Sequence, residues 1–133
     1  MECFFCRIRD KELEHGIFFE DEKCFAIPDK HPVNSGHILL ISKVHESDFW
    51  NLDKEIFKHL ASVAQHLSEV LIEEYKVPKI DFIISGFQIP HTHIHLIPVN
   101  RDMDLFGSYV PKNRITLNEI EIEEIKNKIK SKL

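Results

Sequence analysis

The chain has 133 residues and a formal net charge of −5, with 43% hydrophobic and 29% charged residues. These values predict one globular domain over residues 1–133 and exclude a disordered or low-complexity chain. The acidic balance also argues against a protein that binds nucleic acid through a broad basic surface. Histidine is unusually frequent, with nine residues, and it serves as metal ligand, nucleophile and proton carrier near neutral pH.

The N-terminal segment carries two cysteines, Cys3 and Cys6, among charged residues. The charges interrupt it before the apolar run of a secretory signal develops, and no later stretch reaches the roughly 18 apolar residues of a membrane span. We therefore expect a cytoplasmic protein without membrane contact, in which a structural disulfide is unfavourable. The pair is then a metal half-site, a redox pair or a chance spacing, and Cys24 is a small core residue.

The first third of the chain predicts three strands. Residues 16–20 and 23–27 are short apolar runs with the spacing of a hairpin. Residues 28–36 are rich in turn formers and predict a loop. Residues 37–42 form a nearly continuous apolar run, which is typical of a central strand covered on both faces.

Residues 53–75 predict the clearest helix, because apolar side chains recur there at helical spacing. Asp53 or Asn51 can cap its start, and Pro78 prevents its continuation. His59 and His66 fall on or beside the polar face, which predicts solvated surface imidazoles.

The last third of the chain predicts two more strands and a helix. Residues 80–85 and 92–99 read as strands, and a weaker helix follows a capping box formed by Thr116 and Glu119. Strands in a run, with one long helix inserted and one C-terminal helix, indicate an antiparallel α+β domain.

Three histidines, His91, His93 and His95, alternate along the last predicted strand. Their side chains project from one face, because strand side chains alternate with period two. Mutual repulsion should lower their pKa values and favour the neutral form, which is both nucleophilic and metal-binding. Two interpretations stay open: one imidazole is a nucleophile oriented by its neighbour, or the three together hold a hydrolytic zinc ion.

Residues 90–98 resemble the signature of the histidine triad family of nucleotide hydrolases and transferases. The similarity runs from Cys3 to about Val99 and includes an N-terminal zinc pair, a first hairpin with an acidic residue, and a glycine-histidine segment before an apolar strand. The resemblance implies an antiparallel sheet of about five strands with one long helix, usually paired as a homodimer.

The resemblance also implies roles for single residues. His93 matches the nucleophile that attacks the α-phosphorus of a nucleotide, giving a nucleotidyl-histidine that water hydrolyses. His95 matches a residue that hydrogen-bonds the phosphate oxygens, and His37 matches a further histidine near that site. Asp29 matches the carboxylate that accepts both ribose hydroxyls. The expected ligand is a purine nucleotide such as AMP, and the expected activity is that of a nucleoside phosphoramidase or related nucleotide hydrolase.

In zinc-bearing members of the family, the ligands match Cys3, Cys6, His45 and His91. Such a set of two cysteines and two histidines is a closed tetrahedral site, so the implied Zn²⁺ is structural rather than catalytic. His15 and His31 have no match and read as loop residues.

The segment before the triad departs from the family pattern. Phe87 stands where the family usually has a glutamine that assists the leaving group, and Gln88 comes one residue late, on the opposite face if the segment were a strand. Ser85 is a weak substitute that also belongs to the expected nucleotide site. This departure motivates one alternative, a nucleotide-binding module with little catalysis. A second alternative is a zinc-dependent hydrolase that uses His91, His93 and His95 as ligands.

Overall fold

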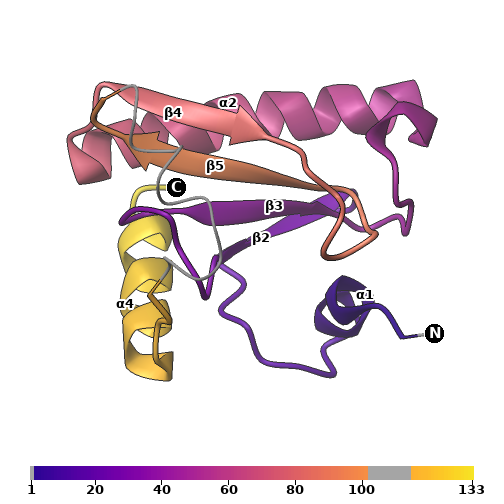
Figure 1. The fold of residues 1–133 in the computed structure, drawn as a ribbon, viewed down its shortest axis with the longest axis horizontal. Coiled ribbons are helices and arrows are strands. Elements are labelled where there is room, and N and C mark those ends of the chain that lie inside the picture. Colours follow the sequence, from indigo (N-terminus) through magenta and orange to yellow (C-terminus); the bar gives the residue numbers. More distant parts are fainter. Residues whose placement is uncertain (1, 102–114) are drawn as a thin grey trace.

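The structure, a computed structural model, describes residues 2–101 and 115–133. One antiparallel sheet of five strands, in the order β1-β2-β3-β5-β4, is combined with helices (Figure 1), which confirms the predicted α+β class. The elements are α1 (Phe4–Arg9), β1 (Phe19–Glu20), β2 (Cys24–Pro28), β3 (Ile38–Ser42), the 3₁₀ helix η1 (Phe49–Asn51), α2 (Lys54–Tyr75), β4 (Lys79–Ile83), β5 (His93–Val99) and α4 (Glu119–Lys130).

The sheet has a hydrophobic cluster on each face, as the alternation of strand side chains requires. On one face Leu40 and Ile94 pack with the apolar side of α2 and with Ile129 of α4. On the other face Leu39 and Ile41 pack with Phe5 of α1. Both faces of the central strand β3 are therefore covered, as its continuous apolar run predicts.

Helix α2 begins and ends as the sequence predicts. The Asp53 carboxylate accepts hydrogen bonds from the backbone N–H groups of Glu55 and Ile56, which are otherwise unpaired at a helix start. Lys76 ends the helix in the left-handed conformation, two residues before Pro78.

The structure differs from the predicted helices in two places. Helix α1 has no counterpart in the prediction, because six residues without a side-chain cap give no periodic signal. The C-terminal capping box is formed by Asn118 and Glu121 rather than by Thr116 and Glu119. Since the backbone N–H of Leu117 donates to the carbonyl of Lys30 at 2.8 Å, the chain is still extended there and the helix starts later.

Three further predictions concern single side chains. Cys24 is fully buried in the core, as expected. His66 is exposed, but His59 is only partly so, and its Nε2 lies 2.5 Å from a carboxylate oxygen of Asp21. His59 therefore joins α2 to the hairpin turn instead of standing in solvent. Within the described residues, the helices are all too short or too polar to cross a bilayer.

Candidate functional site

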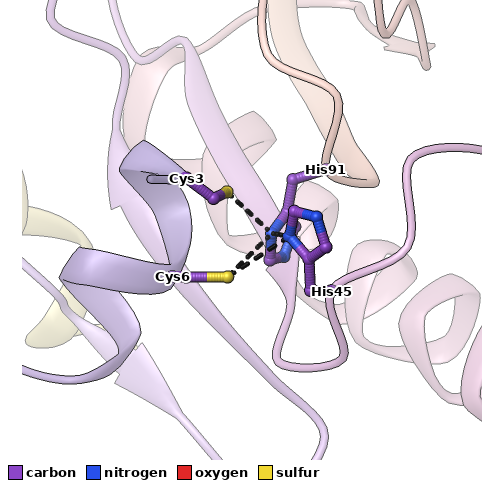
Figure 2. A group of neighbouring side chains, drawn as sticks. All are labelled: Cys3, Cys6, His45 and His91. Carbon is purple, nitrogen blue, oxygen red and sulfur yellow. Dashed lines mark hydrogen bonds between the residues drawn. The ribbon is translucent and has the colours of Figure 1, made fainter. Parts of the chain in front are cut away.

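Four potential metal ligands from three segments meet beside α1. Cys3 precedes α1 and Cys6 lies within it, His45 follows β3, and His91 comes two residues before β5; Figure 2 shows the four side chains pointing toward one another. Cys3 Sγ lies 3.2 Å from His91 Nδ1, and Cys6 Sγ lies 3.3 Å from His45 Nδ1. The two Nδ1 atoms are 3.1 Å apart.

These contacts suit Zn²⁺. Tetrahedral zinc with the usual Zn–S and Zn–N bond lengths needs ligand atoms about 3.3–3.8 Å apart. The three distances above lie within a few tenths of an ångström of that range, and all four ligand atoms lie within 4.8 Å of one another. The orientation of His91 also fits, because its Nε2–H donates to the Ser42 carbonyl at 2.6 Å and leaves the Nδ1 lone pair toward the sulfur atoms. Burial and the neighbouring Cys3 raise the pKa of the Cys6 thiol, whose proton a bound cation would displace.

A second polar group, Asp29, His37 and His95, lies buried against β3 and β5. The backbone N–H of Val33 donates to His37 Nδ1 at 2.9 Å, so the proton of the neutral ring lies on Nε2. That nitrogen is 2.9 Å from His95 Nδ1 and 3.2 Å from a carboxylate oxygen of Asp29. His95 accepts at Nδ1, which places its own proton on Nε2.

His93 lies between these two groups on β5. Its Nδ1–H donates to the backbone carbonyl of His91 at 2.7 Å, which leaves the lone pair on Nε2. Burial lowers the pKa of His93, although the hydrogen bond to His91 and the charge of Asp29 oppose this shift. The ring is therefore neutral near pH 7, the state that an imidazole nucleophile requires.

The expectation that triad pKa values are lowered is confirmed for His91 and His93, but the main cause differs. Burial lowers the pKa of His91 to about 4, and the charges of His45 and His93 contribute less. Repulsion within the triad is thus the minor effect, because the face that carries the histidines is covered rather than open to solvent.

The three triad rings do not converge on one point. Among the residues that the structure describes, the groups close enough to hold a metal place His91 with the cysteines and His95 with Asp29, and none contains all three triad histidines. This geometry disfavours the alternative in which the triad forms a zinc site.

The segment between β4 and β5 is not a strand, so the expected face reversal of Gln88 does not apply. Ser85 and Gln88 are exposed there, and the side chain of Phe87 is 97% exposed. The hydrogen bonds that join Asp29, His37 and His95 do not include Ser85.

Some contacts of the site were not foreseen. The carbonyl of Ser42 and the N–H of Val33 orient two imidazoles, but backbone atoms carry no residue-specific signal. Phe5 packs at the triad, and its place between Cys3 and Cys6 was the available signal.

Strand β5 lies between β3 and β4 and carries His93 and His95, with His91 two residues before it. This alternation of histidines in an antiparallel α+β domain, beside a buried carboxylate and a further histidine, defines a histidine triad domain. The HIT domain pattern matches residues 10–102, which is more than half of the chain. The chain belongs to the HIT family.

Individual relatives extend this comparison. The crystal structure of a hypothetical histidine triad nucleotide-binding protein from Sulfolobus tokodaii superposes with a TM-score of 0.82 at 32% identity, over 97% of this chain and 90% of that chain. A Zn-bound histidine triad family protein from Mycobacterium smegmatis gives a TM-score of 0.78 at 26% identity, over 98% and 92% of the two chains. Adenosine 5′-monophosphoramidase of Saccharomyces cerevisiae is 28% identical over 97 residues, which are 72% of this chain and 61% of the yeast protein.

Proposed function

We propose that this protein hydrolyses a purine nucleoside phosphoramidate, or a related nucleotide, at the α-phosphate through a nucleotidyl-His93 intermediate. The observation that carries the proposal is the orientation of His93, whose Nδ1–H is fixed on the His91 carbonyl at 2.7 Å while Nε2 keeps its lone pair. Membership of a family that includes a yeast adenosine 5′-monophosphoramidase supports the substrate class.

In the first step, His93 Nε2 forms a bond to the α-phosphorus as the bond to the leaving amine breaks. For this step the His37–His95 pair takes up one proton from solvent, and the Asp29 carboxylate balances the added charge; that proton then passes to the leaving amine. Water then attacks the same phosphorus, the bond to His93 breaks, and one proton of the water returns to the pair. In this proposal Asp29 also accepts the ribose hydroxyls, and Ser85 lies beside the nucleotide.

The test is a panel of adenosine phosphoramidates, dinucleoside polyphosphates and adenylylated substrates, run with wild type, His93→Ala and His66→Ala. His66 is an exposed histidine on α2, so its replacement is the matched control. We expect turnover and a quench-trapped adenylyl adduct in wild type and His66→Ala, and neither in His93→Ala. Turnover by a folded His93→Ala protein would refute the mechanism.

The alternative of a nucleotide-binding module with little catalysis is favoured by one observation, the fully exposed Phe87 where the family usually has glutamine. This alternative predicts that AMP raises the unfolding temperature while no substrate of the panel is consumed. Turnover at a rate comparable with other hydrolases would exclude it.

We further propose that Cys3, Cys6, His45 and His91 hold a structural Zn²⁺. The four ligands fill a tetrahedral shell, so the ion would tie α1 to the triad strand and would not itself activate water. Zinc content should fall in Cys3→Ser and stay unchanged in Cys24→Ser, whose cysteine lies elsewhere in the core. Equal zinc content in the two variants would contradict this assignment.

A homodimer is the expected assembly. β4 is an edge strand among the described residues. Phe82 on this strand and Ile72 of α2 remain 46% and 41% exposed. An apolar surface next to an unpaired strand edge suits a second copy of the chain. A single domain over residues 1–133 stays a prediction of the sequence.

A further inference from the structure

Helix α1 places one aromatic side chain between the two cysteines. Phe5 is only 1% exposed and follows Cys3 by two residues, with Cys6 directly after it. Its ring lies edge-on to the His93 ring, with 4.8 Å between centroids and an interplanar angle of 64°. It also meets the His91 ring edge-on, at 5.7 Å. The Phe5 ring therefore packs directly against the ring of His93, the proposed nucleophile.

Helix α1, which carries Phe5, has little stability of its own. It has six residues, and Cys3 at its N-cap makes no side-chain capping hydrogen bond. Isolated helices of this length do not persist in water, so tertiary contacts hold α1 in place. Those contacts include the burial of Phe5 and Ile8 in the cluster with Leu39 and Ile41, and the group of Cys3, Cys6, His45 and His91. The guanidinium of Arg9 also donates to the Lys43 carbonyl at 2.8 Å.

The same four-residue group reaches His93 by a second route. His91 points Nδ1 at the cysteines, and its backbone carbonyl accepts the Nδ1–H of His93 at 2.7 Å. The His91 ring is fixed on its other side by the Ser42 carbonyl. A shift of the His91 backbone would therefore move the acceptor that sets the ring orientation of His93.

We propose that the group of Cys3, Cys6, His45 and His91 also positions the His93 ring. The group fixes both ends of the Cys3–Cys6 turn, so that Phe5 between them shields and orients that ring. Phe5 is a positioning residue, because it acts on His93 and carries no reacting atom. The consequence for turnover rests on the proposed hydrolase function, whereas the shielding of His93 does not.

The shielding is measured by carbethoxylation with diethyl pyrocarbonate at a fixed neutral pH, with each modified histidine located by fragment-ion mass spectrometry. Exposed His66 is the internal reference. The compared samples are zinc-loaded wild type, chelator-treated wild type, and zinc-loaded Phe5→Ala, Phe5→Leu and Phe4→Ala. Phe4 is the matched control, since it lies on the same helix but is 39% exposed.

We expect the rate at His93, relative to His66, to rise about three- to tenfold in Phe5→Ala and in chelator-treated wild type, the factor expected from losing one edge-on aromatic contact. Phe5→Leu should give a smaller rise, and Phe4→Ala none. The zinc content of all three variants should equal that of wild type. Amide hydrogen exchange in residues 3–9 should accelerate on chelation.

Unchanged His93 rates in both Phe5→Ala and chelator-treated wild type would overturn the proposal, and so would a wild-type protein that binds no zinc. If Phe5→Ala does not unfold cooperatively, Phe5→Leu and chelator-treated wild type decide the result. The two proposals fail separately: absence of turnover with every nucleotide refutes the hydrolase function, while equal modification rates beside normal turnover refute only the positioning role.

Discussion

Gly36 is the residue whose replacement should most clearly disturb the loop before His37. Its φ is +86°, and a Cβ added there would lie 2.6–3.0 Å from three ring atoms of Tyr75. Gly86 has a similar φ of +90°, but an added Cβ there would meet only the Ser47 carbonyl, at 3.9 Å. Alanine at the two positions therefore separates backbone strain from steric conflict.

The left-handed conformation costs a non-glycine residue about 1–2 kcal/mol, which applies to both variants. Overpacking a buried site adds about 1–3 kcal/mol, and this applies only to Gly36→Ala. We expect the free energy of unfolding to fall by about 1–2 kcal/mol in Gly86→Ala and by roughly 2–5 kcal/mol in Gly36→Ala. The larger loss is a substantial part of the stability of an ordinary domain.

The assay is urea unfolding of both variants and of wild type at one pH, followed by circular dichroism. A double-mutant cycle with Tyr75→Ala isolates the steric part, because removal of the ring should relieve Gly36→Ala and leave Gly86→Ala unaffected. Equal losses in the two single variants, or no coupling between Gly36 and Tyr75, would refute the reasoning.

Three further predictions test other parts of the molecule. Burial opposes ionisation of Asp21, but hydrogen bonds led by that from His59 hold its pKa below the usual value. The stability that this lowered pKa contributes is present above about pH 4 and is lost as pH falls through the folded-state pKa of Asp21. His59→Gln should therefore lower the free energy of unfolding by roughly 1 kcal/mol at pH 7 and by less at pH 3. Equal losses at the two pH values in urea unfolding would contradict this. Phe82→Glu should sediment as a monomer where wild type and Trp50→Glu are dimers; unchanged mass would exclude that surface. Asp29→Asn should weaken AMP about tenfold in a calorimetric titration, since a charged acceptor becomes neutral; equal affinity would remove Asp29 from the ribose site.

The regular elements were predictable because their signals are local. The apolar run before Ser42 and the helical spacing after Asp53 are readable within a few residues, and the observed starts of these two elements differ from the predicted ones by one position. The first strand is shorter than predicted and begins at Phe19 instead of residue 16. The C-terminal capping box was misplaced because both candidate pairs fit the same spacing. A contact with Lys30, distant in sequence, decides between them.

Residue patterns alone predicted the triad face and a cysteine half-site, whereas the grouping of Cys3 and Cys6 with His45 and His91 came from the family resemblance. Alternation indicated which histidines share a face, but not that α1 covers that face. The pairing of Asp29 with His37, at 3.2 Å, was also missed, because the loop between them hides their proximity. Short helices and backbone acceptors are defined by tertiary contacts, which no local pattern records.

The period of a β-strand explains how one short sequence motif serves several tasks. His91 and His95 are four positions apart, so their Cα atoms are about 13–14 Å apart along an extended strand, and the two outer rings join different groups of side chains. His91 meets the cysteines, and His95 meets His37 across β3. His93, held between them by the His91 carbonyl, is the ring whose Nε2 lone pair is left for chemistry. If the proposed function holds, an anionic nucleotide would meet imidazoles and N–H donors beside the single carboxylate of Asp29, so the net charge of −5 does not by itself oppose binding.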